Sequence, residues 1–347
     1  MNGAKTRTAA ATPGGGRVTR RGALGAALAL AAAPAALAQG GGPAIGEWRP
    51  SRPVRWLVGY PPGGGTDVLA RLVAAAMSPR LGVPVVVENR PGAATNLAAE
   101  AAANAAPDGH TVFTAGNETL VFNPALYKRL PFDADGGLRP LGLMARFHLV
   151  LSARPREAAG DAAAFVARAR ANPGAVDYGS PGVGSPHHLA MERLAREAGV
   201  RLNHVPYRGM APVIADLSSG VVEGAVLDMA AAGSQLRAGA VRGLAVLSPA
   251  PLPTLPGVPT AEAALGLRGF EAYAWQGLTA PARTPDDAAA RLTAELAAAL
   301  ADPAVAGRMR EIGLDPTPGT PAEHAAMIRD ERAIYWPLIR DLDLSLD

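Results

Sequence analysis

Between residues 54 and 115, short apolar runs alternate with segments in which apolar residues recur every three or four positions. Residues 54–60 have the pattern of a strand, and residues 66–80 place Leu69, Val73 and Met77 on one face of a helix. The pattern continues with strands at 83–88 and 111–115 and an alanine-rich helix at 96–106. Strands that are apolar throughout, alternating with helices, predict an α/β fold with a mainly parallel sheet flanked by helices.

The same alternation returns after residue 148. It predicts strands at 149–152, 175–178, 203–206 and 224–228 and helices at 162–171, 187–198 and 211–218. Five prolines at 249–259 interrupt it, and helices resume with leucines at 292, 296 and 300 and with residues 321–340. We therefore expect two α/β domains, the first formed by 53–148 together with 273–347 and the second by 149–272.

The first 38 residues differ from the rest. They contain five basic residues and no acidic one, an apolar run at 22–33, and Ala36-Leu37-Ala38. This is the pattern of an export signal cleaved near Ala38, by the general secretory or the twin-arginine route. The apolar run is shorter than the roughly 20 residues of a membrane span. We expect a periplasmic protein that begins near Gln39, with a linker at 39–52.

Charge and cysteine content narrow the function. The chain of 347 residues has a net charge of +3, but removing the five leader residues from its 33 basic residues leaves 28 against 30 acidic ones. A nearly neutral mature chain is not expected to bind nucleic acid. There is no cysteine, so neither a disulfide nor a lipid-modified cysteine can form. We expect a monomer.

A glycine-rich turn, YPPGGGTD at residues 60–67, joins the first strand to the first helix. Gly63, Gly64 and Gly65 leave the backbone N–H groups uncovered, and the positive end of the helix dipole points at the same place. Such a turn is suited to hold an anion. Asp67 lies beside it, in the first turn of the predicted helix, where its negative charge interacts favourably with the helix dipole. Alternatively, Asp67 orients a water or an amino group.

A second turn, GSPGVGS at residues 179–185, again lies between a predicted strand and a predicted helix. If each domain presents one such turn at the carboxyl ends of its strands, two helix N-termini face each other across a cleft. That arrangement would hold a carboxylate. Thr66 and Ser185 either donate to the anion or cap the helices, and the sequence leaves both roles open.

The sequence lacks the residues that a phosphate-binding loop, a nucleophilic serine site or a metal site requires. A phosphate-binding loop needs a lysine after its glycines, and the only lysine after the leader is Lys128. No serine lies in a Gly-x-Ser-x-Gly motif. His187, His188 and Glu192 could offer two metal ligands on one helix face, but no third ligand has motif spacing, so we favour structural roles. No catalytic residue, metal or cofactor is expected.

Several motifs in one order then resemble the Bug family, the TctC-like substrate-binding proteins of tripartite tricarboxylate transporters. They are residues 55–67 (RWLVGYPPGGGTD), 85–93 (VVVENRPGA), 106–111 (APDGHT), 123–127 (NPALY), 184–190 (GSPHHLA), 204–209 (HVPYRG) and 275–281 (WQGLTAP). The likeness runs from about residue 52 to the C-terminus.

The resemblance implies a two-domain periplasmic binding protein of the Venus-flytrap type, type II, that closes on a small carboxylate. The implied ligand-binding residues are Pro62, Gly63, Gly64, Gly65, Thr66 and Asp67 on one side and Gly182, Val183, Gly184, Ser185 and Asp228 on the other. The implied partners are the large and small transmembrane components of a transporter, and the ligand would be a di- or tricarboxylate, an amino acid or an aromatic acid.

The segment Asn117-Glu118-Thr119 departs from the family pattern, which is commonly small and hydroxylated there. If Glu118 and Asn117 face the cleft, the carboxylate of Glu118 disfavours a second ligand carboxylate and favours an amine or a hydroxyl. Alternatively, Glu118 is exposed at the surface.

The expected function is therefore capture and delivery of a carboxylate, without catalysis. A receptor that signals to a membrane sensor would have the same sequence features. A secreted enzyme on this fold would need an acid–base constellation that the sequence does not show.

Overall fold

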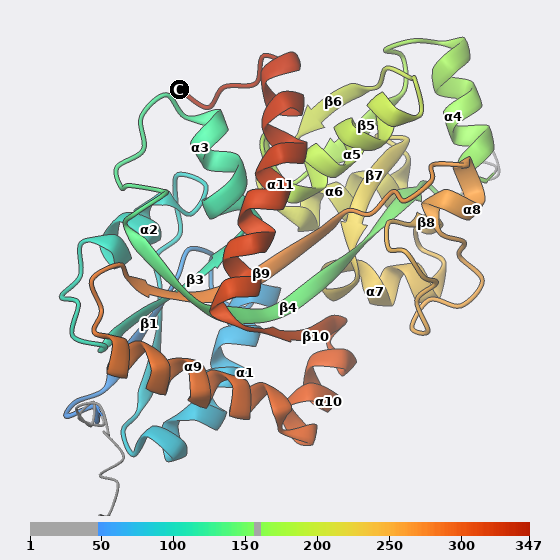
Figure 1. Cartoon of the computed structure of the whole chain (residues 1–347). Coiled ribbons are helices and arrows are strands. Elements are labelled where there is room, and N and C mark those ends of the chain that lie inside the picture. The colour runs from blue at the N-terminus through green and yellow to red at the C-terminus, as the bar shows by residue number, and fades with distance from the viewer. Residues whose placement is uncertain (1–47, 156–160) are drawn as a thin grey trace, which may run out of the picture. The chain divides into compact units, whose positions relative to one another are not determined.

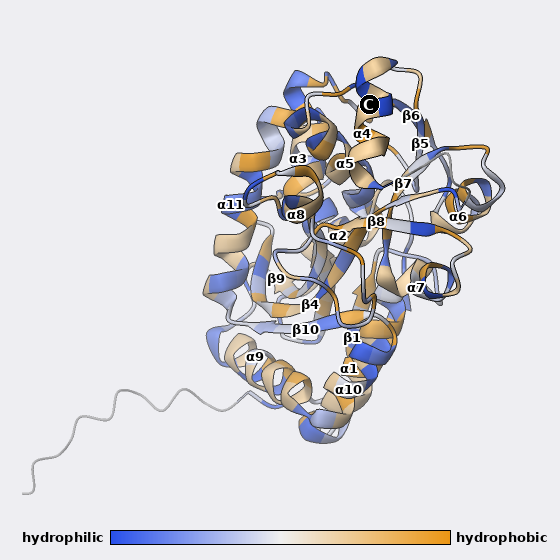
Figure 2. Cartoon of the chain, turned by 90° about the vertical axis from the view of Figure 1, so that its right-hand side faces the viewer, coloured by the Kyte–Doolittle hydropathy of each residue, from blue (hydrophilic) through white to orange (hydrophobic). Residues whose placement is uncertain are grey.

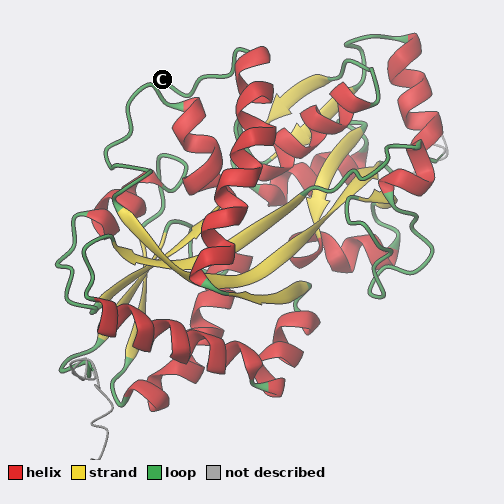
Figure 3. Ribbon diagram, viewed as in Figure 1, coloured by secondary structure: helices red, strands yellow, loops and turns green. Residues whose placement is uncertain are grey.

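The strands join into a mixed sheet in the order β2-β1-β3-β9-β4-β7-β5-β6, with β10 and β8 also paired to β4 (Figures 1 and 3). The computed structural model describes residues 48–155 and 161–347, so the predicted export signal and most of the linker lie outside the described residues. The strands are β1 Val54–Val58, β2 Val85–Asn89, β3 Thr111–Gly116, β4 Leu138–Ala153, β5 Asp177–Ser180, β6 Asn203–Pro206, β7 Gly224–Asp228, β8 Arg242–Val246, β9 Tyr273–Pro281 and β10 Leu314–Gly319.

Helices cover both faces of this sheet (Figure 3). They are α1 Gly65–Leu81, α2 Asn96–Ala103, the π-helical turn η1 Glu118–Phe122, α3 Asn123–Leu126, α4 Ala162–Ala171, α5 Pro186–Glu197, α6 Met210–Ser219, α7 Met229–Ala238, α8 Ala261–Leu265, α9 Asp286–Ala301, α10 Pro303–Glu311 and α11 Pro321–Asp341. In the part of the chain that the structure describes, no helix has the length and apolar character needed to cross a membrane.

Parallel pairing is confined to the two ends of the sheet. Strand β1 pairs in parallel with β2 and β3, and β5 pairs in parallel with β6 and β7. The strands β4 and β9 between them pair antiparallel with their neighbours. The predicted α/β class is confirmed, while the sheet as a whole is mixed instead of mainly parallel.

The long strand β4 runs through the whole centre of the sheet (Figure 1). It pairs with β9 as far as His148, opposite Tyr273, and with β7 from Leu149, opposite Asp228. This change of partner falls at the predicted boundaries 148/149 and 272/273. The described residues nevertheless belong to one compact unit, and the division into two domains stays a prediction.

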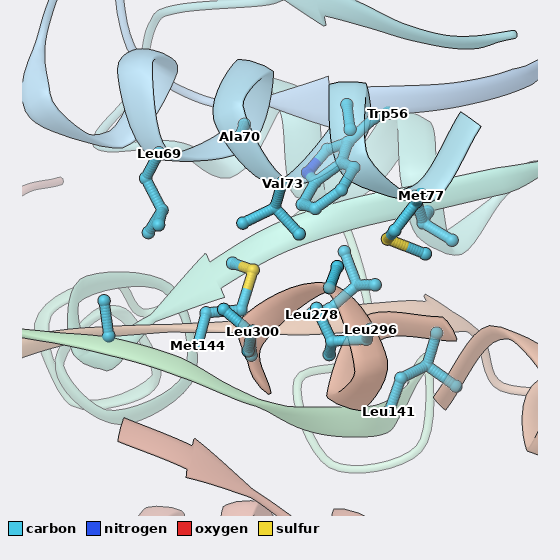
Figure 4. Close-up of a cluster of buried hydrophobic side chains, with 14 of the residues drawn as sticks. Trp56, Leu69, Ala70, Val73, Met77, Leu141, Met144, Leu278, Leu296 and Leu300 are labelled. Carbon is cyan, nitrogen blue, oxygen red and sulfur yellow. The ribbon is translucent and has the colours of Figure 1, made fainter. Parts of the chain in front are cut away.

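A core cluster fixes the direction of α1 against the sheet (Figure 4). Trp56 of β1 is fully buried and donates its Nε1–H to Thr114 Oγ1 at 2.6 Å. The cluster also buries Leu69, Val73 and Met77 of α1 and Leu296 and Leu300 of α9. Figure 2 shows the matching alternation of hydrophobic and hydrophilic bands on α1 and α9. Burial of this face holds the first turn of α1 just beyond the carboxyl end of β1.

Helix α11 packs across β4 on the other side of the sheet (Figure 1). It begins with a capping box between Thr320 and Glu323. Its Glu331 is buried and accepts a hydrogen bond from Trp275 Nε1 at 2.8 Å. Burial raises the pKa of Glu331 to about 8. Trp275 is thus a core residue.

Candidate functional site

The first glycine turn leaves the start of α1 open. The N-cap residue of α1 is Gly64, with φ −75° and ψ 164°, and no side chain caps this end. Pro62, Gly63 and Gly64 are exposed, and a Cβ built on Gly64 would meet only Pro61 O, at 3.7 Å. The N–H groups at a helix start have no partner within the helix, so an uncapped start offers several donors to an anion.

Asp67 fixes the shape of this turn. Its buried carboxylate accepts hydrogen bonds from the Gly63 N–H at 2.9 Å and from Asn89 Nδ2 at 2.8 Å, and it pairs with Arg71 at 2.9 Å. Burial alone would raise the pKa of Asp67, but the hydrogen bonds from Arg71, Gly63 and Asn89 outweigh it and lower that pKa. The carboxylate is therefore occupied by the protein, which fits a role in holding the turn.

The second turn is capped by side chains. Ser185 Oγ accepts the His188 N–H at 3.2 Å, and the Gly184 N–H donates to His188 Nδ1 at 3.0 Å. Gly182 and Gly184 have φ of +151° and +75°, a region that favours glycine. Ser185 thus caps α5, whereas Thr66 is buried in the first turn of α1 behind its Gly64 cap. Val183 is half-buried in this turn, and a direct role of any of these residues in binding stays a prediction.

Three stacked side-chain rings lie next to the second turn. The rings of His188 and His204 lie 3.9 Å apart, and that of Tyr178 lies 4.9 Å from His204. His204 Nε2 is 2.6 Å from Ser180 Oγ. Burial lowers the pKa of His188 to about 3, with a smaller contribution from His204, and it lowers the pKa of His204 to about 4. Both rings are therefore neutral near pH 7.

This arrangement bears on the possible metal ligands. His188 Nδ1 is engaged by the turn, and Glu192 Oε1 accepts a hydrogen bond from the Tyr178 hydroxyl at 2.5 Å. The described residues contain no group of three or more His, Cys, Asp or Glu side chains placed to hold a metal ion. The structural roles that the sequence favoured for His188 and Glu192 agree with these contacts.

The starts of α1 and α5 both lie against the start of α7. A Cβ built on Gly65 would lie 2.9 Å from Phe147 Cε1 and 3.5 Å from Ala230 Cβ, so the start of α1 abuts β4 and the start of α7. His187 at the start of α5 places Nε2 3.1 Å from Asp228 Oδ2. Asp228 in turn caps α7. The N-terminal ends of three helices, which are the positive ends of their dipoles, therefore lie near one another.

Asp228 is ionised in this setting. Its burial would raise its pKa, but the hydrogen bond and charge of His187 and the N–H groups of Ala231 and Ala230 lower it. Because an ionised carboxylate only accepts hydrogen bonds, His187 Nε2 carries the proton of this contact. Asp228 thus forms part of the wall of the candidate site. Its carboxylate already accepts the N–H groups at the start of α7.

Glu118 also faces this region. It is half-buried and accepts a hydrogen bond from the Tyr60 hydroxyl at 2.6 Å. Burial raises the pKa of Glu118, and the hydrogen bond from Tyr60 and the nearby His187 offset part of that rise. Of the two alternatives that the sequence left open, these contacts favour the inward position. Asn117 is buried and donates from Nδ2 to Tyr273 O at 3.0 Å, a contact that joins β3 to β9.

Tyr60, His187 and Gln276 were not predicted as ligand-binding residues, although Tyr60 begins the glycine turn and His187 was considered as a metal ligand. Gln276 is 4% exposed, and its side chain also hydrogen-bonds the Tyr60 hydroxyl. A signal for Gln276 was present, because it is the one amide side chain in the predicted run at 273–281.

Comparisons of the sequence identify similar proteins. The family model described as "Tripartite tricarboxylate transporter family receptor" matches residues 69–344. A "UPF0065 protein in tcbD-tcbE intergenic region" of Pseudomonas sp. (strain P51) is 37% identical over 297 residues, 85% of this chain and 88% of that protein. "Protein BugT" of Bordetella pertussis is 32% identical over 305 residues, 88% of this chain and 93% of that protein.

Solved structures agree with this result. Rpa4515 of R. palustris with adipate has a TM-score of 0.78 and 31% identity, covering 85% of this chain and 99% of that one. MatC (Rpa3494) from Rhodopseudomonas palustris with bound malate has a TM-score of 0.74 and 32% identity, covering 84% and 99%. The periplasmic binding protein BugD has a TM-score of 0.75 and 30% identity, covering 85% and 99%.

Proposed function

Because this chain belongs to the tripartite tricarboxylate transporter receptor family, as its motifs indicated, we propose that it binds a small carboxylate in the periplasm and delivers it to membrane transport subunits. The similar structures with adipate and with malate support a carboxylate as the ligand class. The ligand of this chain is a di- or tricarboxylate, an amino acid or an aromatic acid.

The open start of α1 is the observation that carries this proposal. Its Gly64 cap has no side-chain acceptor, and it lies where the starts of α5 and α7 also converge. Each hydrogen bond to a charged group contributes about 1.5–3 kcal/mol. A helix dipole adds about 0.3–1 kcal/mol at an exposed site and more when partly buried. One ligand carboxylate is thus stabilised by amides that otherwise face solvent.

Closure of the site would use the strands that run through the centre of the sheet. Strands β4 and β9 are the elements next to the change of pairing at His148 and Leu149. A small rotation there would move the turn at 60–67 relative to the turn at 179–185. Contacts made between the two turns only in the closed state would then favour the bound form.

Titration calorimetry with a panel of carboxylates tests ligand capture. The panel contains mono-, di- and tricarboxylates, amino acids and aromatic acids, with phosphate and sulfate as anion controls. We expect saturable one-to-one binding of at least one carboxylate and no binding of phosphate or sulfate. The opposite preference, for the inorganic anions, would exclude the proposed ligand class.

Delivery to a transporter requires a separate test. Cells that lack this gene should lose uptake of the isotope-labelled ligand, and uptake should return with the wild-type gene. If deleting the gene alters the transcriptional response to the ligand and leaves uptake intact, the protein is instead a sensor. The bound ligand should be recovered unchanged after prolonged incubation, because the proposal includes no chemical step.

A further inference from the structure

A buried acceptor without a partner marks the wall of the proposed site. Gln276 Oε1 has no hydrogen-bond partner among the described residues, although its side chain is almost fully buried. Leaving a buried polar atom unpaired destabilises the protein, so such atoms in folded proteins are normally satisfied by the protein, by water or by a ligand.

The surroundings of Gln276 set the orientation of its amide. The Tyr60 hydroxyl donates to Glu118 Oε2 at 2.6 Å, and the Gln276 side chain hydrogen-bonds the same hydroxyl. The hydroxyl uses its proton in the hydrogen bond to Glu118, so Gln276 can only donate to the hydroxyl oxygen, through Nε2. The Oε1 atom is then left as an acceptor. A Cβ at Gly116 would clash with Trp275 O and lie 2.9 Å from both amide atoms of Gln276, so glycine is needed where β3 passes this part of β9.

A second acceptor in the region belongs to Glu118. It accepts the hydrogen bond of the Tyr60 hydroxyl on Oε2, which leaves its other oxygen available. His187 donates from Nε2 to Asp228, and its buried Nδ1 has no partner among the described residues. Gln276 and Glu118 come from β9 and η1, and both lie next to Tyr60.

Donors and acceptors are therefore separated in the site. The start of α1 offers N–H donors to the ligand carboxylate, whereas Gln276 and Glu118 offer acceptors. On the basis of the proposed function, we infer that the ligand is a carboxylate with a hydrogen-bond-donating substituent, a hydroxyl or an ammonium group, which Gln276 Oε1 and Glu118 recognise. A second ionised carboxylate at that position would face acceptors only.

Matched triplets of ligands test this inference on the wild-type protein. Each triplet keeps one carbon skeleton and changes one substituent: succinate, malate and aspartate; butanoate, 3-hydroxybutanoate and 3-aminobutanoate; phenylpropanoate, phenyllactate and phenylalanine. In the skeleton that binds, we expect a hydroxylated or aminated member to bind at least about tenfold more tightly than the unsubstituted one, since the latter leaves a buried acceptor unpaired. Equal affinities within that triplet would overturn the inference and leave carboxylate capture intact. Failure of every carboxylate to bind would overturn the proposed function itself.

Two variants separate the acceptors. Gln276→Leu should reduce the preference for the substituted ligand to less than about threefold, whereas Gln235→Leu on α7 serves as the control and should keep the full preference. Glu118→Gln removes a negative charge, so it should lower the preference for the amino over the hydroxy ligand and keep that for the hydroxy over the unsubstituted one. An unchanged preference in a folded Gln276→Leu protein would contradict the assignment. The wild-type triplets decide the question if that variant does not fold.

Discussion

Replacing Gly64 by aspartate should separate stability from binding. The φ of −75° and ψ of 164° at Gly64 suit any L-residue, and a Cβ there meets only Pro61 O at 3.7 Å. An aspartate at this N-cap can accept hydrogen bonds from the first turn of α1. The better cap and the smaller entropy of the unfolded chain together stabilise the fold by about 1 kcal/mol. We expect Tm to rise by about 2–4 °C.

The same carboxylate occupies the donors that the ligand needs. If the ligand loses two charge-assisted hydrogen bonds of about 1.5 kcal/mol each, binding weakens by about 3 kcal/mol, or more than a hundredfold. Repulsion between the two carboxylates adds to this loss. Gly64→Asp should therefore be slightly more stable than the wild type and unable to bind the ligand.

Two further substitutions at the same position are controls. Gly64→Ala adds a Cβ without an acceptor or a charge, so affinity should stay within about threefold of the wild type. Gly64→Asn can cap the helix but carries no charge, so its affinity should fall between those of the alanine and aspartate variants. Calorimetry and thermal unfolding measure both quantities. Full affinity in a folded Gly64→Asp protein, or an equal loss with alanine, would refute the reasoning.

Three other predictions follow from buried groups. Gly184 has φ +75°, and a Cβ there would lie against Leu126, whereas Gly199 has φ +65° and open space around it. Gly184→Ala should therefore lower the free energy of unfolding by at least about 1 kcal/mol more than Gly199→Ala. Equal losses in urea unfolding would exclude crowding at Gly184. The pKa of Glu331 is raised to about 8 from 4.5, so the folded state binds more protons than the unfolded state. The free energy of unfolding should therefore fall as pH rises from 4.5 to 8, by up to about 1.4 kcal/mol per pH unit. Glu331→Gln should lack this decline, and a profile identical to that of the wild type would contradict the raised pKa of Glu331. The pKa of His204 is lowered to about 4 from 6.5, so here the unfolded state binds more protons and the free energy of unfolding should fall as pH drops from 6.5 to 4. A His204 signal in NMR that titrates near 6.5 would show that the ring is not buried as described.

The elements that carry local signals could be predicted from the sequence. Helix α1 was expected at 66–80 and lies at Gly65–Leu81, and the strand at 224–228 and the helix at 162–171 have the predicted bounds. Glycines, helix caps and apolar periodicity act over a few residues, so one sequence is enough to read them. Both glycine turns lie between a strand and a helix for the same reason.

Strand β4 shows where such local signals fail. Only residues 149–152 were expected, but β4 begins at Leu138. Its first part contains Pro140 and Gly142, and the register with β9 shifts between these residues and again between Leu143 and Ala145. Proline, glycine and irregular register disguise the two-residue period of a strand. The pairing with β9, 130 or so residues away in sequence, stabilises the strand nevertheless.

The side chains of the site depend still more on tertiary structure. Tyr60, Glu118 and Gln276 meet only because β3 lies next to both β1 and β9. Glu118 also begins a π-helical turn, which changes the direction of side chains relative to a regular α-helix. Backbone donors could thus be proposed from glycines alone, whereas of the acceptors only Glu118 was a candidate from the sequence and Gln276 was not.

A crystal structure of the protein with a carboxylate chosen by calorimetry would test the central claim most directly. The account predicts one ligand carboxylate at the start of α1, with its oxygens within about 3.2 Å of the N–H groups of residues 64–66, directly or through one ordered water. A carboxylate bound elsewhere, with the start of α1 facing solvent in the complex, would contradict the account.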